Sequence, residues 1–353
     1  MKLLVCALEA SSNIHLKALK EHLSDKCEFI GIFDKSLGNP RYDISQLAIM
    51  GFVDVLKRLP FFLNLKKEMV TLAQEADKIL LMDSSGFNLP LAKDLKKKYP
   101  DKEIIYYILP QAWAWKQGRI KKIEARCDTL CSILPFEKEY YSKKKMIKYV
   151  GHPLLDEIQE FKKEFIPSDI IAFMPGSRKA EISKLLPIYK QIASSLKGKK
   201  AILIVPQKFS SNEIKDIYGK IDMFYEISNN AHETLYKSEF AFICSGTATL
   251  EASLIGTPFV LSYIAKALDY FLASKLIKLD YVGLANIMYS YIDKTQLHKE
   301  FLQEEVTVEN LLDTYETFDK NAFFQKVQKL RDYLQHGSSK EVANIIEMDI
   351  NEN

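Results

Sequence analysis

Short apolar runs alternate with stretches of helical periodicity along the whole chain. The apolar runs predict buried strands over residues 2–8, 28–33, 78–82, 103–109, 129–134, 170–174, 201–205, 223–226, 239–243 and 258–261. Apolar positions spaced three and four apart predict helices over residues 14–23, 65–76, 89–99, 179–196, 232–236, 247–255, 321–335 and 339–348. This alternation is typical of the α/β class, in which helices connect the strands of parallel sheets.

The length of the chain, 353 residues, predicts two domains. The boundary is expected within residues 151–168, where Gly-His-Pro and Ile-Pro-Ser interrupt a charged stretch. We therefore expect two Rossmann-like parallel-sheet domains facing across a cleft, residues 1–160 and 161–337, with a helix at 338–353 packing back onto the first. Ligands of open α/β sheets bind outside the carboxyl ends of the strands, so the cleft is the expected active site.

The charge distribution and the cysteines limit the partners and the cellular compartment expected for this protein. Residues 1–150 carry 26 Lys and Arg against 18 Asp and Glu, whereas residues 151–353 carry 23 against 28. A basic first half favours an anionic partner for that domain, although a chance imbalance on solvated surfaces explains the numbers equally well. The five cysteines are scattered without zinc-ligand spacing, which predicts a reduced, cytoplasmic protein without a metal or cofactor. No apolar run is long enough to span a membrane.

Two loops in the second half have the composition of phosphate-binding turns. Pro175-Gly176-Ser177-Arg178 follows one predicted strand, and Cys244-Ser245-Gly246-Thr247 follows another; each leads into a helix. Helix N-termini present unpaired N–H groups to anions, and Arg178 adds a charge suited to a diphosphate. Glu251, one turn into the second helix, is a candidate acceptor for ribose hydroxyls. The alternatives are glycine turns that merely connect elements and a solvated carboxylate.

Two residues are candidate general bases. Asp83 ends a predicted strand beside Ser84-Ser85-Gly86, where a carboxylate would face the cleft. His152 lies where the two halves of the chain meet, and its ordinary pKa suits proton transfer near neutral pH. The alternatives are an aspartate that caps a turn and a histidine that packs at a boundary.

One segment of the first half combines bulky apolar residues with cations, which suits an anionic membrane surface or an acyl chain. Its members are Phe52, Lys57, Arg58, Phe61, Phe62, Lys66 and Lys67. A second basic cluster at residues 116–126 lies beside Trp113 and Trp115, but no nucleic-acid-binding motif accompanies it, so nucleic acid is not an expected partner.

Several of these strings, taken in order along the chain, resemble the lipid-A-disaccharide synthases, bacterial glycosyltransferases of GT-B architecture (glycosyltransferase family 19). The matching strings are Leu47-Ala48-Ile49-Met50-Gly51, Asp83 with Phe87-Asn88, Pro110-Gln111-Ala112-Trp113-Ala114-Trp115, Leu134-Pro135-Phe136-Glu137, Val150-Gly151-His152-Pro153, Pro175-Gly176-Ser177-Arg178 with Glu181, Ser245-Gly246-Thr247-Ala248 with Leu250-Glu251, and Asp280-Tyr281-Val282 with Leu284 and Asn286.

Two loops depart from the family pattern. The family's Gly-Glu-x-Ser-Gly-Asp corresponds to Leu8-Glu9-Ala10-Ser11-Ser12-Asn13 here, and its Asp-x-Pro-Asp-Phe-Asn corresponds to Asp83-Ser84-Ser85-Gly86-Phe87-Asn88. These changes weaken the inference that this chain contacts the acceptor through the same loop residues as the family. They also leave Asp83 as the only carboxylate in its loop.

The resemblance implies an inverting transfer that joins UDP-2,3-diacylglucosamine to 2,3-diacylglucosamine 1-phosphate and releases UDP. The implied enzyme is peripheral, at the cytoplasmic face of the inner membrane, and a homodimer is a candidate assembly. The implied sites are catalytic Asp83 and His152; donor contacts from Ser177, Arg178, Ser245, Gly246, Thr247, Glu251 and Asn286; and acceptor contacts from Glu9, Ser11, Asn88 and Trp115. A UDP-sugar 2-epimerase with the same fold and a non-enzymatic nucleotide sensor at the membrane are the alternatives.

Overall fold

The computed structural model describes residues 1–45, 59–114, 117–206, 209–224, 226–244, 246–265 and 280–348. The chain divides into two compact units, unit 1 comprising Met1–Asp156 with Leu334–Asn353 and unit 2 comprising Glu157–Tyr333. The chain therefore passes between the units after Asp156 and after Tyr333, whereas the sequence pattern predicts these crossings after residues 160 and 337.

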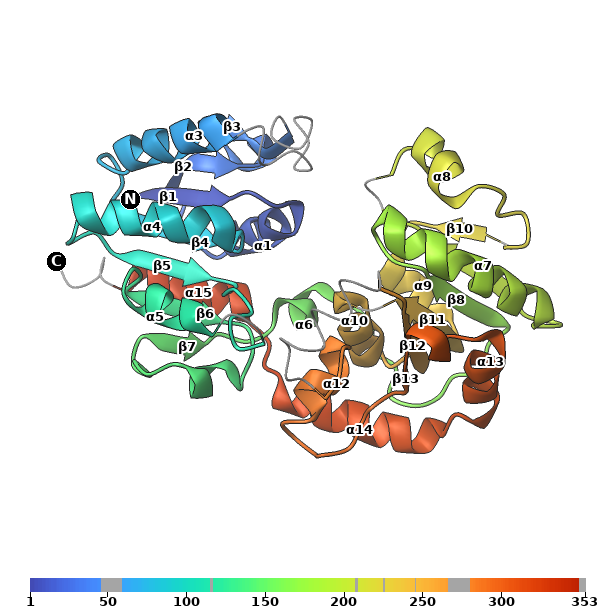
Figure 1. Ribbon diagram of the computed structural model, residues 1–353. Coiled ribbons are helices and arrows are strands. Elements are labelled where there is room, and N and C mark those ends of the chain that lie inside the picture. Colours follow the sequence, from blue (N-terminus) through green and yellow to red (C-terminus); the bar gives the residue numbers. More distant parts are fainter. Residues whose placement is uncertain are drawn as a thin grey trace. The chain divides into compact units, whose positions relative to one another are not determined.

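Unit 1 is built on a seven-stranded sheet in the order β3-β2-β1-β4-β5-β6-β7, with every neighbouring pair parallel (Figure 1). The strands are β1 (Lys2–Ala7), β2 (Glu28–Phe33), β3 (Tyr42–Asp43), β4 (Lys78–Met82), β5 (Ile104–Tyr107), β6 (Thr129–Ser132) and β7 (Ile147–Tyr149). The pattern of apolar runs misses β3 and β7, because two or three residues at a sheet edge are too few to form a run.

Helices cover both faces of the unit 1 sheet, because successive residues of each strand point to opposite faces. Leu3 and Val5 of β1 pack in one core with α1 (Ala10–Lys20) and α15 (Ser338–Glu347). Leu4 and Cys6 pack in the other with α3 (Leu59–Leu72), α4 (Ser85–Lys98) and α5 (Gly118–Glu124). The C-terminal helix α15 thus completes a core begun by the first strand. Short helical turns at η1 (Lys35–Leu37), η3 (Glu137–Tyr140) and α6 (Pro153–Glu157) connect the rest.

Unit 2 contains a second parallel sheet, of six strands in the order β10-β9-β8-β11-β12-β13. The strands are β8 (Ile170–Met174), β9 (Lys200–Ile204), β10 (Glu226–Ser228), β11 (Phe240–Cys244), β12 (Phe259–Tyr263) and β13 (Glu300–Leu302). β10 begins where the predicted strand over 223–226 ends. β13 was not predicted, since this three-residue strand begins with the charged Glu300. The predicted fold class, two parallel-sheet α/β domains, is confirmed.

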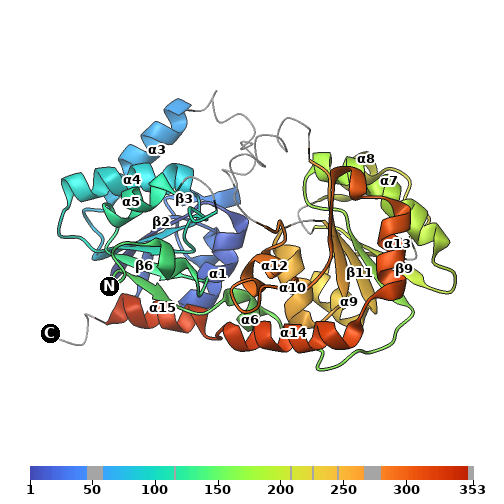
Figure 2. The same ribbon diagram turned by 60° about the horizontal axis from the view of Figure 1, so that its bottom comes forward.

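The helices of unit 2 also form two layers. The side chains of α7 (Lys179–Ser195), α8 (Ser211–Tyr218) and α13 (Val308–Thr317) share an apolar core with β8 and β11, in which the rings of Phe173 and Phe242 stack at 5.2 Å. On the other side, α10 (Thr247–Ile255) contacts α9 (Ala231–Lys237), α12 (Leu284–Tyr289) and α14 (Lys320–Tyr333), as Figure 2 shows. A short turn, η4 (Gln303–Glu305), follows β13.

Both sheets share one topological feature that indicates where a ligand is expected to bind. The strand order reverses between β1 and β4 in unit 1 and between β8 and β11 in unit 2. The connections diverge there to opposite faces of the sheet, which leaves a crevice at the carboxyl ends of the two central strands. Glu9 and Asp83 follow the two central strands of unit 1, and the loops at Gly176 and Gly246 follow those of unit 2.

Candidate active-site residues in the two units

Asp83 of unit 1 is held in an unusual backbone conformation at the end of β4. Asp83 and Ser84 have φ angles of 47° and 38°, in the left-handed region that side chains other than glycine seldom adopt. Such residues cost of order 1–3 kcal/mol each and persist where their surroundings hold them. Here the carbonyl of Asp83 accepts hydrogen bonds from Tyr106 Oη at 2.6 Å and from Asn88 Nδ2 at 3.0 Å. The turn is therefore fixed from β5 and from α4.

The surroundings of Asp83 raise the pKa of its carboxyl group. Burial contributes most and the nearby Glu9 carboxylate adds to it, while the Ser84 N–H and His15 act in the opposite direction. Glu9 is itself tied to this loop, because the Ser84 hydroxyl donates to Glu9 Oε1 at 3.0 Å. An aspartate with its ordinary pKa of about 3.9 is a weak base, and a carboxylate with a raised pKa is a stronger one.

The side chain of Asn88 holds this loop in place, and its predicted role as an acceptor contact stays a prediction. Its side chain is fully buried, and its Nδ2 donates to the carbonyls of Cys6 at 3.3 Å, Met82 at 2.9 Å and Asp83 at 3.0 Å. The amide thereby joins the ends of β1 and β4. Ser11, another predicted acceptor contact, lies exposed in the first turn of α1.

Asn13 stands where the family pattern has an aspartate. Its Nδ2 donates to the carbonyls of Ala7 at 2.9 Å and Glu9 at 2.8 Å, and its Oδ1 accepts from Asp34 N at 2.8 Å. An aspartate has no N–H to donate, so the asparagine holds the end of β1 by bonds that an ionised aspartate cannot make. Asn13 and Asn88 thus shape the turns that carry Glu9 and Asp83.

His152 is buried, and its contacts argue against the predicted alternative role as base. Burial lowers the pKa of the imidazole to about 3, with a further contribution from His15. The Leu154 N–H donates to Nδ1 at 3.3 Å, so the single proton of the neutral ring is on Nε2 and the Nδ1 lone pair is already used. The backbone N–H of His152 donates to Gln335 O at 2.9 Å. Gly151, with φ of 90°, allows this approach, since a Cβ there would lie 2.7 Å from Gln335 O.

In unit 2, the loop after β8 already holds an anion of the protein itself. The N–H groups of Ser177 and Arg178 both donate to Glu181 Oε2 at 3.3 Å, and a Cβ on Gly176 would lie 2.7 Å from the same oxygen. The Arg178 guanidinium bonds Glu181 Oε1 at 2.7 Å and is 78% exposed. The loop therefore accommodates a carboxylate against its backbone and leaves Arg178 open to solvent. A diphosphate can use the two N–H groups only when the Glu181 carboxylate leaves them.

The second loop leads from β11 through Gly246, with φ of 126°, into α10. Ser245, a predicted donor contact, lies outside the described residues. Thr249 stabilises the turn by donating from Oγ1 to Gly246 O at 2.9 Å. Glu251 lies four residues beyond Thr247 and therefore on the same face of α10. Its Oε1 is 2.9 Å from Nε2 of His232 on α9, a residue that belongs to none of the motifs in the sequence.

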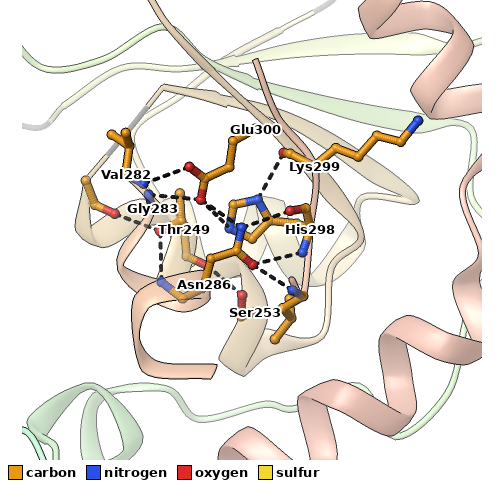
Figure 3. Close-up of polar contacts among 11 residues, drawn as sticks. Thr249, Ser253, Val282, Gly283, Asn286, His298, Lys299 and Glu300 are labelled. Atoms are coloured by element: carbon orange, nitrogen blue, oxygen red, sulfur yellow. Dashed lines mark hydrogen bonds and ion pairs between the residues drawn. The ribbon is translucent and has the colours of Figure 1, made fainter. Parts of the chain in front are cut away.

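Asn286, a predicted donor contact, is enclosed in a buried polar network instead (Figure 3). Its Nδ2 donates to His298 O at 2.9 Å and Glu300 Oε1 at 2.7 Å, and its Oδ1 accepts from the N–H groups of Leu297 at 2.6 Å and His298 at 3.1 Å. These four bonds use the full capacity of the amide, so no group remains for a ligand. Asn286 thus has a structural role in this structure, and its contact with the donor stays a prediction.

The same network fixes the loop before α12. The Glu300 carboxylate accepts from the backbone N–H groups of Val282 at 2.7 Å and Gly283 at 3.1 Å, the two residues that precede α12. Thr249 connects the start of α12 to α10, because the Ala285 N–H donates to its Oγ1 at 3.5 Å. The exposed residues of this loop are thereby held beside the helix that begins at Thr247.

The predicted membrane-facing segment is described only from Leu59 onward, so Phe52, Lys57 and Arg58 lie outside the described residues, as does Trp115. Phe61 and Phe62 are half-buried against the core, with ring contacts to Tyr42 at 6.2 Å and Phe87 at 6.3 Å respectively. The exposed apolar side chains of α3 are Leu59 and Leu63, at 53% and 46%. Within the described part of the chain, no helix is both long enough and apolar enough to cross a membrane.

Comparison with solved structures identifies the fold class. UDP-N-acetylglucosamine 2-epimerase from Neisseria meningitidis, solved with UDP-GlcNAc, matches with a TM-score of 0.64 over all of both chains at 12% identity. A spinosyn rhamnosyltransferase matches with a TM-score of 0.54 over 99% of both chains, also at 12% identity. The protein thus has the two-domain fold that GT-B glycosyltransferases share with these epimerases, and at this identity the likeness concerns the fold alone.

Sequence comparison identifies the family. The family model described as lipid-A-disaccharide synthetase matches residues 3–349. Lipid-A-disaccharide synthases from Helicobacter pylori strain G27 and Campylobacter jejuni strain RM1221 are 50% and 48% identical, each over 97% of this chain and over 97% and 98% of their own lengths. The chain belongs to the lipid-A-disaccharide synthetase family and is a glycosyltransferase of lipid A biosynthesis. Family membership therefore decides between transferase and epimerase, which the fold leaves open.

Proposed function

We propose that this chain transfers 2,3-diacylglucosamine from UDP to 2,3-diacylglucosamine 1-phosphate, forming the β-1,6-linked disaccharide of lipid A. Membership in the family supports the reaction. The loops at the points where the strand order of each sheet reverses support a separate role for each unit. Unit 1 supplies the base and binds the acceptor, and unit 2 binds the UDP-sugar donor.

The proposed step is a single displacement with inversion, and the observation that carries it is the environment of Asp83. The acceptor hydroxyl oxygen bonds to the anomeric carbon of the donor as the bond from that carbon to the diphosphate oxygen breaks. The hydroxyl proton passes to the Asp83 carboxylate, and UDP leaves with the bonding electrons. The raised pKa of Asp83 favours it over His152, whose Nδ1 lone pair is engaged and whose pKa is lowered.

The donor site of the proposal uses charge and helix ends rather than a metal ion. The exposed Arg178 guanidinium and the N-termini of α7 and α10 offset the charge that develops on the departing diphosphate. Thr247 and Glu251 share one face of α10, so a nucleotide with its phosphates at the N-terminus has its ribose within reach of the carboxylate. Ser177 contributes a backbone N–H once Glu181 has moved.

The acyl chains of both substrates require an apolar surface, and the proposal assigns this role to α3. Leu59 and Leu63 are four residues apart on one face of the helix, and the exposed Lys67 follows on that face. Such a face suits peripheral binding to an anionic bilayer, with the cytoplasmic face of the inner membrane as the expected location.

The proposal is tested by assaying UDP release from UDP-2,3-diacylglucosamine with and without the acceptor, in the presence of EDTA. Release that requires acceptor, with a disaccharide detected by mass analysis, is the expected result. Isomerisation of the donor without acceptor would instead identify an epimerase. Binding of UDP without either reaction would identify a nucleotide sensor.

A further inference from the structure

His232 and Glu251 form a close pair between two helices of unit 2. His232 is the second residue of α9, and its Nε2 lies 2.9 Å from Oε1 of Glu251 on α10. The side chains are 32% and 20% exposed, so neither is sealed from a ligand in solution. A carboxylate only accepts hydrogen bonds, and the Nε2–H of His232 is therefore the donor in this pair.

The position of His232 on its helix makes the pair informative. A cation in the first turn of a helix is disfavoured by the helix dipole, which instead favours carboxylates such as that of Glu233. The hydrogen bond to Glu251 nevertheless raises the pKa of His232 despite its burial, and the charges of Glu251 and Glu157 add to the effect. The contact with Glu251 is thus strong enough to outweigh burial.

The elements packed against α9 contain few other charges. In α10, Glu251 is the only residue with an ionisable side chain, and β8 has none. The ionisable side chain of β9 is that of Lys200, which pairs with Asp169 at 3.1 Å. On α9 itself, Glu233 and Lys237 bond each other at 2.5 Å. Glu251 and Glu157 are therefore the charges that govern His232.

The hydrogen bond also constrains how Glu251 can act. Side chains of a helix lean toward its N-terminus, so Glu251 leans toward Thr247 and the start of α10. With Oε1 bound to His232, Oε2 is the oxygen left to accept hydrogen bonds from a neighbouring diol. A carboxylate held at one oxygen loses less rotational freedom when a ligand binds at the other.

We propose that His232 is a positioning residue for the nucleotide donor: it fixes the Glu251 carboxylate for the ribose hydroxyls and adds a positive charge beside the diphosphate site. This inference rests on the proposed donor site in unit 2 and adds a residue to it. Because the imidazolium charge attracts the anionic nucleotide, UDP binds more weakly as the pH rises through the pKa of His232. That pKa lies above its ordinary value of about 6.5.

The test measures UDP binding by calorimetry on the full chain between pH 6 and pH 9, without acceptor. The His232→Gln variant keeps an N–H donor but carries no charge, and the His232→Phe variant has neither. The terminal phosphate of UDP also titrates, near pH 6, but it does so identically for every variant. The ratio of dissociation constants between a variant and the wild type therefore isolates the contribution of His232.

The expected result is a His232→Gln variant that binds several-fold more weakly than wild type at pH 6 and equally well at pH 9. His232→Phe should bind about tenfold more weakly even at pH 9, the scale of one lost hydrogen bond to a charged group. In turnover assays, both changes should raise the KM for the donor more than they lower kcat. A variant-to-wild-type ratio that is flat with pH for Gln and close to one for Phe would overturn the proposal.

The donor site is tested separately by Glu251→Gln and Arg178→Ala in the same titration. If wild type binds UDP but both variants bind equally well, the proposed donor site is wrong, whatever His232 does. If both weaken binding while the His232 variants match wild type throughout, the donor site stands and the role of His232 is rejected. Thermal unfolding of each variant serves as the control for folding.

Discussion

The phenol of Tyr106 donates a 2.6 Å hydrogen bond to the backbone carbonyl of Asp83, so the end of β5 fixes the end of the neighbouring β4. Asp83 and Ser84 both have positive φ angles at this point. Strain of this kind is characteristic of functional sites, because evolution retains it where the orientation of a side chain matters more than local stability. The catalytic proposal for Asp83 therefore stands on geometry as well as on its electrostatic environment.

Replacing Asp83 with Asn keeps the shape of the side chain and removes its basicity. We expect a loss of roughly 10²–10⁴-fold in kcat, the range for removal of a general base. His152→Asn is the comparison, because Asn Oδ1 can still accept the Leu154 N–H. Nearly normal activity of the Asp83 variant, with an inactive His152 variant, would transfer the base role to His152.

The pH profile of kcat/KM gives a second test of Asp83. The carboxylate acts only when ionised, so activity falls as the pH drops through its pKa, which lies above the ordinary value for aspartate. Glu9→Gln removes a charge that raises this pKa and keeps an acceptor for Ser84. The acid limb of the profile should therefore move to lower pH in Glu9→Gln. An unmoved acid limb would show that Glu9 does not act on the base.

His152 links the stability of unit 1 to pH. Its pKa falls from 6.5 to about 3 on folding, so between these values the unfolded state binds more protons and stability decreases as the pH falls. The expected slope is up to about 1.4 kcal/mol per pH unit, and His152→Asn should reduce it. Both tryptophans, Trp113 and Trp115, belong to unit 1, so denaturant unfolding followed by their fluorescence reports this unit. An unchanged slope in the variant contradicts the prediction.

Arg178 should matter for turnover and little for folding. Its guanidinium is 78% exposed, and exposed ion pairs such as that with Glu181 contribute about 0–1 kcal/mol to stability. Loss of a group that stabilises the leaving diphosphate should lower kcat by roughly 10²-fold or more in Arg178→Ala. Arg178→Lys keeps the charge but loses the bidentate geometry, so its kcat should lie between those of wild type and Arg178→Ala. Normal UDP affinity and turnover in Arg178→Ala would remove Arg178 from the donor site.

Asn286 should affect folding of unit 2 in the first place. Asn286→Ala removes one of the hydrogen bonds to Glu300 and leaves the N–H groups of Leu297 and His298 without their buried acceptor, at a cost of about 1–3 kcal/mol for each unsatisfied group. We expect a clear fall in the unfolding temperature measured by calorimetry. If the variant instead unfolds like wild type and shows only a raised KM for the donor, Asn286 contacts the nucleotide after all.

Membrane binding through α3 is tested by sedimentation with anionic vesicles at low and high salt. Leu59→Ser combined with Leu63→Ser removes exposed apolar side chains, so binding should fall without loss of stability. Phe61→Ser with Phe62→Ser is the contrasting pair, because these rings pack on the core and their loss should destabilise unit 1. Each cation near the surface contributes about 1 kcal/mol, and this part weakens with salt. Unchanged pelleting of the leucine variant would assign the membrane contact elsewhere.

The fold class, the family and the loops where chemistry is expected all follow from the sequence alone. Apolar runs report burial directly, so the long central strands were predicted nearly to the residue, as for β4 and β8. Asp83 and Arg178 were selected as candidates because ligands of parallel sheets bind at the loops that follow the strands. Motifs of this kind consist of residues that are neighbours in the sequence, so they can be recognised without the tertiary structure.

Only the folded chain shows which of the selected polar residues are exposed and which are buried in hydrogen bonds with the backbone. Asn88 and Asn286 look like contact residues in the sequence, yet both are buried with amides that bond backbone groups outside their own helices. His232 and Glu251 are 19 residues apart and meet only because α9 and α10 pack together. The hydrogen-bond partners and the burial of a side chain depend on neighbours that folding brings together, and the spacing of residues along the chain does not encode them.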